Sequence, residues 1–359
     1  MKIIFICTRS ITFNTFLKSQ ANYLIKRGFK VEVACSDSEK LNFNKNLNHK
    51  INFQTRMIDL FNIKRYLEIF FQIRSLIKKN NKTIFFIHTP VASHLFRLLT
   101  FFYKLKIIYF VHGFRFTSNT SVFKSLFFKV IEKILSIKTD IFITINNEDY
   151  NYTQNNLSRS ALCYKLNGIG LSKSLKIKKK NHKKEIRKIL VVAAYKKEKG
   201  YFEVLKVAEM LKDKNIKIEC YGYGNSNQFN SIKIKKNLKN ISFNEFDKNL
   251  KNKIKKYDIL LHLSKREGLP VAVMQCLSEG LPVICYNIRG NNDLIVDKFN
   301  GLFVHTYKDV PKKIFYLNLE EEFFNKLRNN AIKSINKNFF ENEINYKLYK
   351  IIKNYTNNY

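Results

Sequence analysis

Apolar runs of strand length alternate with helical patterns along the first half of the chain. An amphipathic segment at 14–27 ends at Gly28, a residue that commonly stops a helix in a left-handed conformation. Near-continuous apolar strands separated by helices predict a parallel sheet with helices on both faces. The expected strands of this half lie at 2–7, 30–35, 84–88, 107–112 and 141–145.

A second series of the same kind follows a segment in which Lys dominates. Residues 171–187 carry little that is apolar beyond Leu and Ile, which is typical of an exposed linker. A helix is then predicted at 201–212, and strands at 188–193, 216–221, 241–243, 259–263, 283–286 and 301–304. The predicted fold class is α/β, with two facing Rossmann-like domains and a cleft between them.

These patterns also set the expected domain boundaries. We predict an N-terminal Rossmann-like domain at 1–172, a Lys-rich linker at 173–187 and a C-terminal Rossmann-like domain at 188–340. A final helix at 341–359 is expected to pack back towards the N-terminal domain. Since ligands of such sheets bind beyond the carboxyl ends of the strands, polar residues at those ends are the first candidates for chemistry.

The segment from Ser264 to Gly301 holds the most informative group of such residues. A predicted strand runs into a turn at Glu267 and Gly268, and a helix begins near Pro270. Gly268 lets the backbone approach a ligand closely, and the start of the helix offers free N–H groups to an anion such as a diphosphate. A carboxylate at Glu267 can accept hydrogen bonds from sugar hydroxyls. The residues alone fit an ordinary strand, turn and helix equally well.

The same segment resembles the signature of the family 4 glycosyltransferases, E-G-x-P-x-x-x-x-E-A-x-x-x-G-x-P-V. The resemblance implies the GT-B fold of two Rossmann domains, retention of anomeric configuration, and a nucleotide-sugar donor. It implies that Glu267 contacts the transferred sugar, and that Gly268 and Leu269 help to bind the donor. The second Glu of the signature, which holds the ribose hydroxyls, falls on Gln275. An amide there still bonds hydroxyls, but without charge assistance.

Further segments resemble a bacterial subgroup of that family, which makes capsule, exopolysaccharide or O-antigen chains. They are I-R-G-N-N-D-L-I from Ile288, H-G-F-R-F from His112, T-I-N-N-E-D-Y from Thr144, H-T-P from His88 and N-G-I-G-L from Asn167. The resemblance places His112 near the donor sugar and phosphates. His88 is the weaker candidate and would line the acceptor side. A buried structural role is the alternative for each histidine.

Other donor-binding candidates follow strands of the second half. Lys199 matches the Lys of the family pattern G-R-x-x-x-x-K-G, whose two cations neutralise the diphosphate, but Ala194 stands where the Arg is expected. Gly222 and Gly224 suit a close approach of the backbone to the nucleotide. No DxD motif or carboxylate cluster indicates a divalent metal, so neither a metal nor another cofactor is expected.

The charge is far from balanced. Lys and Arg number 65 against 28 Asp and Glu, a formal net charge of +37. Compositional drift, an anionic membrane surface and nucleic acid each fit that value. Predicted helices at 66–79, 94–106 and 122–138 mix Phe and Leu with Lys and Arg, which fits either plain packing or an interfacial helix. No nucleic-acid-binding module is recognisable, so nucleic acid is not the expected partner.

The sequence therefore predicts a retaining hexosyltransferase. We expect it to move a hexose or N-acetylhexosamine from a nucleotide sugar, UDP-linked by expectation, to a lipid-diphosphate-linked glycan bound by the N-terminal domain. The expected location is the cytoplasm, at the inner face of the membrane; six scattered Cys without metal-ligand spacing agree with reduced thiols there. Gln275 and Ala194 keep open an alternative, a catalytically impaired partner subunit of the same fold.

Overall fold

The computed structural model describes residues 1–53, 62–78, 83–117, 120–157, 159–172 and 185–357. The chain divides into two compact units, which are taken separately below. The first unit comprises Met1–Gly170 together with Glu341–Tyr359, and the second comprises Leu171–Phe340. Most of the expected Lys-rich linker, at 173–184, lies outside the described residues.

The first unit is built on a parallel sheet of seven strands in the order β3-β2-β1-β4-β5-β6-β7. The strands are β1 (Lys2–Ile6), β2 (Lys30–Cys35), β3 (Asn48–Lys50), β4 (Thr83–His88), β5 (Lys106–Val111), β6 (Ile141–Thr144) and β7 (Leu162–Lys165). All strands predicted for this half are present. The edge strands β3 and β7 were not predicted, because they are short and only partly buried and so lack an apolar run.

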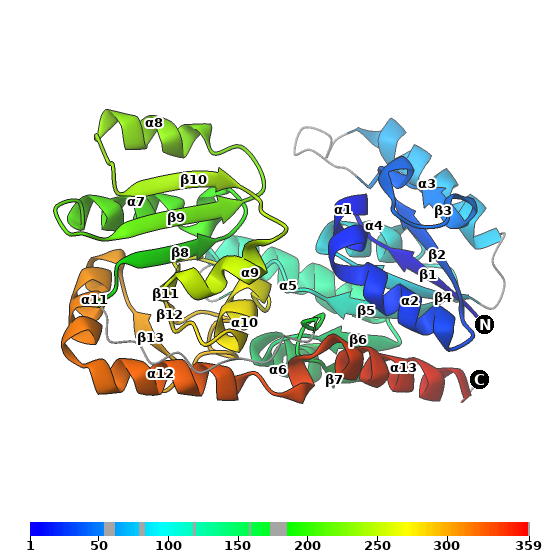
Figure 1. Ribbon diagram of the computed structural model, residues 1–359. Helices are drawn as coiled ribbons and strands as arrows, with labels where there is room; N and C mark the ends of the chain where they lie inside the picture. Colours follow the sequence, from blue (N-terminus) through cyan, green and yellow to red (C-terminus); the bar gives the residue numbers. More distant parts are fainter. Residues whose placement is uncertain (54–61, 79–82, 118–119, 158, 173–184, 358–359) are drawn as a thin grey trace. The chain divides into compact units, whose positions relative to one another are not determined.

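Helices cover this sheet, as Figure 1 shows. They are α1 (Ser10–Thr12), a π-helical turn (Phe13–Leu17), α2 (Lys18–Lys26), α3 (Ile63–Lys78), α4 (Pro90–Leu99), α5 (Val122–Ser136), α6 (Asn147–Asn156) and α13 (Glu341–Asn357). The helix predicted at 94–106 is wrong in both bounds. Pro90 starts α4 because a proline needs no helical N–H partner there, and Lys106 already belongs to β5.

A buried charge cluster ties α4 to α5 on one side of this sheet. The Arg97 side chain is 0% exposed, and its Nη2 donates to Glu132 Oε2 at 2.7 Å. His94 Nε2 lies 2.7 Å from Oε1 of the same carboxylate, and the Arg97 guanidinium stacks 4.5 Å from the Tyr109 ring centroid. Burial alone would raise the pKa of Glu132, but the charges and hydrogen bonds of Arg97 and His94 together outweigh burial, and the pKa lies below its usual value. The carboxylate is therefore an internal anchor between the two helices.

The second unit repeats the architecture with six parallel strands in the order β10-β9-β8-β11-β12-β13. Its strands are β8 (Lys188–Val192), β9 (Lys217–Gly222), β10 (Ile241–Glu245), β11 (Ile259–His262), β12 (Val283–Tyr286) and β13 (Gly301–Val304). The main helices are α7 (Tyr201–Met210), α8 (Asn227–Lys235), α9 (Leu250–Lys253), α10 (Val271–Ser278), α11 (Val310–Leu319) and α12 (Glu321–Ser334). All strands predicted for this half are present too.

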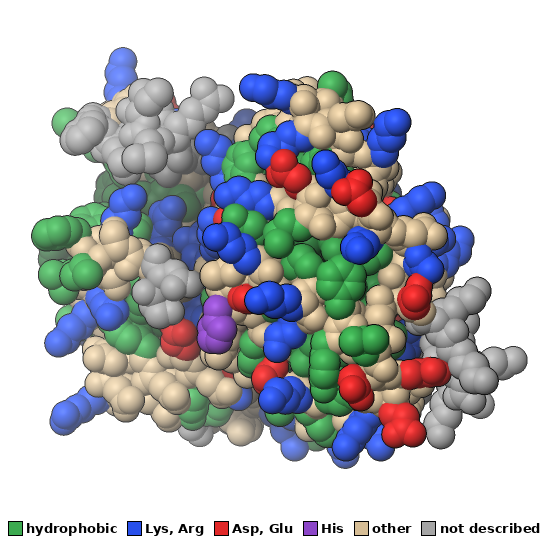
Figure 2. All heavy atoms as spheres, turned by 90° about the vertical axis from the view of Figure 1, so that its left-hand side faces the viewer, with side chains coloured by type: hydrophobic (Ala, Val, Ile, Leu, Met, Phe, Trp, Pro, Cys, Tyr) green, Lys and Arg blue, Asp and Glu red, His purple; other side chains and the backbone are tan. Residues whose placement is uncertain are grey.

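Positive charge is scattered over the face of the molecule that Figure 2 draws. Figure 2 shows Lys and Arg side chains spread over the face drawn there, between hydrophobic and acidic ones.

Among the described helices, none is long and apolar enough to span a membrane. All six cysteines are free thiols.

Candidate active site

Three neighbouring strands of the second unit bring the main candidates to one edge of its sheet. Because β8 pairs with β11 and β11 with β12, all in parallel, their carboxyl ends lie side by side. The loop after β8 carries Lys199, the loop after β11 carries Glu267, and the loop after β12 carries Arg289. The strand order thus gathers residues that lie far apart in the sequence.

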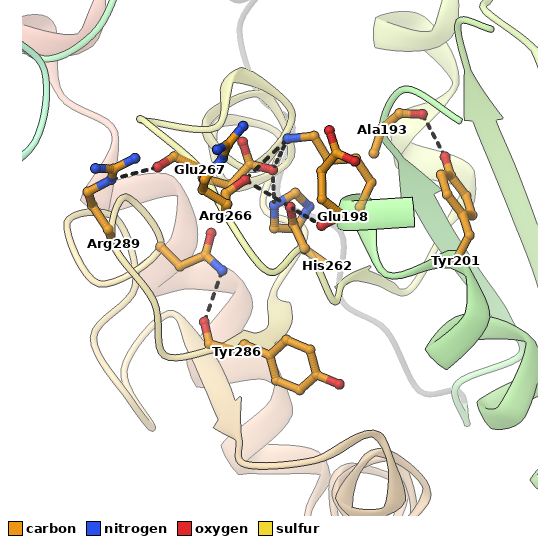
Figure 3. A network of polar contacts seen from close by, with 11 residues as sticks. Ala193, Glu198, Tyr201, His262, Arg266, Glu267, Tyr286 and Arg289 are labelled. Carbon is orange, nitrogen blue, oxygen red and sulfur yellow. Dashed lines mark hydrogen bonds and ion pairs between the residues drawn. The ribbon is translucent and has the colours of Figure 1, made fainter. Parts of the chain in front are cut away.

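Glu267 is the centre of this group, and Figure 3 shows its neighbours. Lys199 Nζ lies 2.6 Å from Glu267 Oε1, and both side chains are largely shielded from solvent. His262, the last residue of β11, places Nε2 at 3.3 Å from the same oxygen, within ion-pair distance but without a hydrogen bond. The carboxylate therefore faces one ammonium and one imidazole.

These neighbours keep the carboxyl ionised. Burial alone would raise the pKa of Glu267, but the contact with His262 and the charge of Lys199 outweigh burial and lower the pKa to about 2. At neutral pH Glu267 is thus a carboxylate that accepts hydrogen bonds and holds no proton to give. It is suited to bind hydroxyl groups and unsuited to act as a general acid.

The turn around Glu267 depends on two glycines that approach neighbouring backbone closely. A Cβ on Gly290 would lie 2.4 Å from the Gly268 carbonyl oxygen, and a Cβ on Gly200 would lie 2.0 Å from the Leu263 carbonyl oxygen. Both glycines have positive φ, at 81° and 78°. Arg289 Nε also donates to the Glu267 carbonyl at 2.9 Å (Figure 3). The loops after β8, β11 and β12 are therefore locked against one another by backbone contacts.

The other predicted donor residues lie nearby in the same unit. Leu269 is buried before α10, and Gln275 is half-buried on α10. Gly222 ends β9 against the Ala193 carbonyl, which also accepts a hydrogen bond from the Tyr201 hydroxyl at 2.6 Å. Gly224 follows with φ of 98°. The roles of these residues in binding the donor stay predictions.

The first unit has its own polar group at the carboxyl ends of β4 and β5. His88 Nδ1 lies 3.1 Å from His112 Nε2, and the two rings are tilted against each other. Burial lowers the pKa of His112 to about 4 and that of His88 well below its usual value. Both rings are therefore neutral at pH 7, and the buried His88 Nε2 has no hydrogen-bond partner among the described residues.

A strained residue follows this pair. Thr89 begins the turn into α4 with φ of 68°, a rare value for a β-branched residue. Its hydroxyl holds the end of β1, lying 2.7 Å from the Thr8 hydroxyl and accepting from the Thr8 N–H at 3.1 Å. Such strain persists where the surroundings fix the backbone and is common at functional sites.

Sequence reasoning missed two residues of the charged group. His262 is the one polar residue in the run I-L-L-H-L at the end of a predicted strand, and that position was the available signal. Arg289 lies in the segment I-R-G-N-N-D-L-I, which pointed only to the bacterial subgroup. No local pattern shows that its side chain reaches the Glu267 backbone. Within the described ranges, no three His, Cys, Asp or Glu side chains gather closely enough to hold a metal ion.

Comparison with known proteins finds a family match for each half of the chain. The family model described as "Glycosyl transferases group 1" matches residues 172–334, and "Glycosyl transferase 4-like" matches residues 2–146. The chain is 26% identical over 254 residues to the O-antigen biosynthesis glycosyltransferase WbnH of Escherichia coli, covering 69% of this chain and 71% of that protein.

A shorter stretch resembles another transferase from Escherichia coli. It is 40% identical over 53 residues to UDP-Gal:alpha-D-GlcNAc-diphosphoundecaprenol alpha-1,3-galactosyltransferase, covering 15% of this chain and 14% of that one.

Solved structures agree with the fold. The structure of Anabaena Alr3699/HepE in complex with UDP-glucose superposes with a TM-score of 0.76 at 11% identity, covering 99% of this chain and all of that one. The two family matches span most of the sequence, and the predicted fold is confirmed. The chain belongs to the family 4 glycosyltransferases and has their GT-B fold.

Proposed function

We propose that this glycosyltransferase is a retaining enzyme of bacterial surface-polysaccharide synthesis. It would move a hexose or N-acetylhexosamine from a UDP-sugar to a lipid-diphosphate-linked glycan. The observation that carries this proposal is the ionised Glu267, held by Lys199 and His262 at the carboxyl edge of the second sheet.

The chemistry of this group fits a sugar nucleotide. Glu267 accepts hydrogen bonds from sugar hydroxyls, while Lys199 and the free N–H groups at the start of α10 offer positive charge to a diphosphate. Gln275 supplies an amide for ribose hydroxyls. The likeness to a fold that binds UDP-glucose in Anabaena Alr3699/HepE supports a UDP-linked donor.

The relatives support the acceptor and the pathway. WbnH is named for O-antigen biosynthesis, and the Escherichia coli galactosyltransferase is named for a diphosphoundecaprenol acceptor. We assign the acceptor to the first unit. His88, the candidate for the acceptor side, and His112, the catalytic candidate expected near the donor sugar, are both neutral at pH 7, so they can exchange hydrogen bonds with hydroxyl groups but bring no charge to a phosphate.

The reaction needs no side chain as nucleophile. The acceptor hydroxyl oxygen forms a bond to the anomeric carbon on the face from which the nucleoside diphosphate departs, and the bond from that carbon to the phosphate oxygen breaks. The acceptor proton passes to the departing phosphate oxygen. Lys199 stabilises the charge that develops on this leaving group, and Glu267 holds the sugar that is transferred.

We propose that no metal or other cofactor takes part, because a lysine and a helix start supply the positive charge at the site. Transfer should then change less than about twofold when a chelator is added, since no step would depend on a bound cation. Loss of activity in the chelator, with recovery on adding Mg²⁺ or Mn²⁺, would contradict this.

A donor screen with Glu267→Ala tests the site. We expect the wild-type enzyme to transfer from at least one UDP-sugar to a crude lipid-linked acceptor, followed by mass spectrometry. We expect Glu267→Ala to lower the rate by about a thousandfold or more, because it removes the hydroxyl acceptor at the sugar. Glu209→Ala is the matched control, since Glu209 pairs with Lys236 at 2.6 Å on the surface of the same unit. Full activity of Glu267→Ala would refute the assignment.

The second candidate, an impaired partner subunit, is motivated by Gln275 and Ala194, which depart from the family pattern. Gln275→Glu and Ala194→Arg restore that pattern. If the wild-type protein transfers nothing and neither restored variant binds UDP in calorimetry, this second candidate replaces the enzyme.

A further inference from the structure

The helix α5 of the first unit has an apolar side that the fold leaves uncovered. Two of its residues, Phe123 and Phe127, are 88% and 60% exposed. Five more exposed apolar residues share the helix or its end, so that the set, which we name the α5 outer face, is Val122, Phe123, Leu126, Phe127, Val130, Ile134 and Ile137. A helix on the surface of a soluble protein normally turns polar residues outward.

These residues form one continuous stripe. At 100° per residue they fall within about 140° of the helix circumference. The side of α5 that faces the sheet is the opposite one, where Glu132, Leu135 and Ser136 are buried. The buried Arg97–Glu132 pair fixes this orientation, because it ties the inner side of α5 to α4. The α5 outer face is therefore exposed because the inner side of the helix is tied to α4.

The stripe continues past the end of α5. Lys138 Nζ lies 5.2 Å from the Phe101 ring centroid, which brings the turn after α4 next to the C-terminal end of α5. In that turn Phe102 is 94% exposed, and Leu98 in the last turn of α4 is also exposed. The uncovered apolar surface thus spans two helices.

Lysines flank the stripe on both sides. By the same helical geometry Lys129 and Lys133 follow one edge and Lys124 follows the other, and Lys138 comes in the turn after the helix. The one acidic residue of α5 is Glu132, which is buried and paired with Arg97. Glu148 borders a hollow shared with Val122 and Leu126 at the beginning of the helix. The outer face is otherwise apolar in the middle and cationic at its margins.

We propose that the α5 outer face docks on an anionic lipid bilayer, with Phe123 and Phe127 inserted among the headgroups. An apolar stripe with Lys on both margins fits a helix that lies in the plane of a membrane interface. A second copy of the chain is a less favourable partner for this face than a bilayer. A two-fold contact would bring like-charged margins together in a chain of net charge +37. Such docking would bring the enzyme to its lipid-linked acceptor, and only this purpose rests on the proposed function.

Vesicle sedimentation with the full chain tests the docking. The probes are vesicles of phosphatidylcholine with phosphatidylglycerol, and vesicles of phosphatidylcholine alone. We expect binding to the anionic vesicles and a loss of at least about tenfold in partitioning for Phe123→Ser/Phe127→Ser. The matched control is Ile234→Ser/Leu319→Ser, which removes two apolar side chains that are 76% and 83% exposed in the second unit. This control should bind as the wild type does.

A second pair of variants tests the margins. Lys124→Gln/Lys133→Gln should lose about fivefold in partitioning for each lysine, and Lys212→Gln/Lys235→Gln should lose less. Equal losses in the two variants would show diffuse charge attraction and overturn the role of α5.

Other outcomes also decide against the proposal. It fails if the wild-type chain ignores anionic vesicles, or if Phe123→Ser/Phe127→Ser binds them unchanged. It fails equally if that variant alters only the oligomeric state in size-exclusion chromatography, since a protein contact would then cover the face. Vesicle binding needs neither donor nor acceptor, so this result is independent of whether the chain transfers sugar.

Discussion

The first unit places two neutral imidazoles at the carboxyl edge of its sheet, whereas the second places a carboxylate, an ammonium and an imidazole there. Buried charge also occurs in the first unit, and its Arg97–Glu132 pair lies between α4 and α5. The same architecture thus uses charge in two ways. In one unit it holds helices together, and in the other it faces the edge where ligands of such sheets bind.

The largest expected effect follows from the internal charge of the first unit. Glu132→Ala should lower the free energy of unfolding by about 3–5 kcal/mol, because it leaves the buried charge of Arg97 without its counter-ion. Glu209→Ala, which breaks the exposed pair with Lys236, should cost about 0–1 kcal/mol. Since the chain has no Trp, denaturant unfolding is followed by circular dichroism. If both variants lowered the free energy of unfolding by a similar amount, the Arg97–Glu132 pair would not be a structural anchor.

The next effect concerns the turn that carries Glu267. Gly290→Ala should cost about 3 kcal/mol, since the new Cβ meets the Gly268 carbonyl at 2.4 Å and φ is 81°. Gly28→Ala separates the two causes, because φ is 89° there but nothing lies within 4 Å of the new Cβ. That control should cost about 1 kcal/mol. Thermal unfolding of both variants measures this difference. Equal falls in Tm would mean that the Cβ added at residue 290 does not clash with the Gly268 carbonyl.

Lys199→Ala should affect activity more than stability. We expect kcat/KM to fall about a hundredfold, because the proposed neighbour of the leaving diphosphate is lost. The free energy of unfolding should fall by about 1–2 kcal/mol, less than for Glu132→Ala, because Lys199 is 21% exposed and Glu267 keeps its contact with His262. Lys199→Arg should recover part of the rate by keeping the charge. A variant that loses stability and keeps its rate would make Lys199 a structural residue like Arg97.

The last effect is a difference in pH dependence. His112 has an ordinary pKa of 6.5 when unfolded and one of about 4 when folded, so the unfolded state binds more protons between these values. Stability should therefore fall by about 2–3 kcal/mol as the pH drops from 6.5 to 4. Glu267 acts in a lower window, because its pKa moves from 4.5 to about 2. Its contribution to stability is lost as the pH falls through that range.

His112→Asn isolates this effect. Between pH 7 and 4.5 the thermal midpoint of the wild type should fall more steeply than that of the variant, because only the wild type has His112 to protonate. Parallel curves would mean that His112 is not held neutral by burial.

Most of the fold follows from the sequence because its strands are buried on both sides and read as apolar runs. The edge strands β3 and β7 escaped because an edge strand is half exposed, and its pattern resembles that of a loop. The bounds of α4 were misjudged because apolar residues continue through the turn at Phe101 and Phe102 into β5. There the hydrophobic pattern follows an exposed surface rather than the helix.

The candidate site was predicted in part for a related reason. Glu267 and Lys199 stand 68 residues apart, and strand order alone brings them into contact, so the sequence could name them but not their pairing. His262 was missed because a His in an apolar run reads as a core residue, and Arg289 because its partner is a backbone oxygen. Pairings of this kind depend on tertiary distances that no local pattern contains.

The last helix has a consequence for how the molecule is made. Helix α13 belongs to the first unit, where Ile344, Leu348 and Ile352 are buried and Asn345 bonds Ser19 on α2 at 3.1 Å (Figure 1). A ribosome makes this helix only after the whole of Leu171–Phe340. Domains usually fold in the order of synthesis. Here the first unit can bury Ile344, Leu348 and Ile352 only after the second unit has been synthesised.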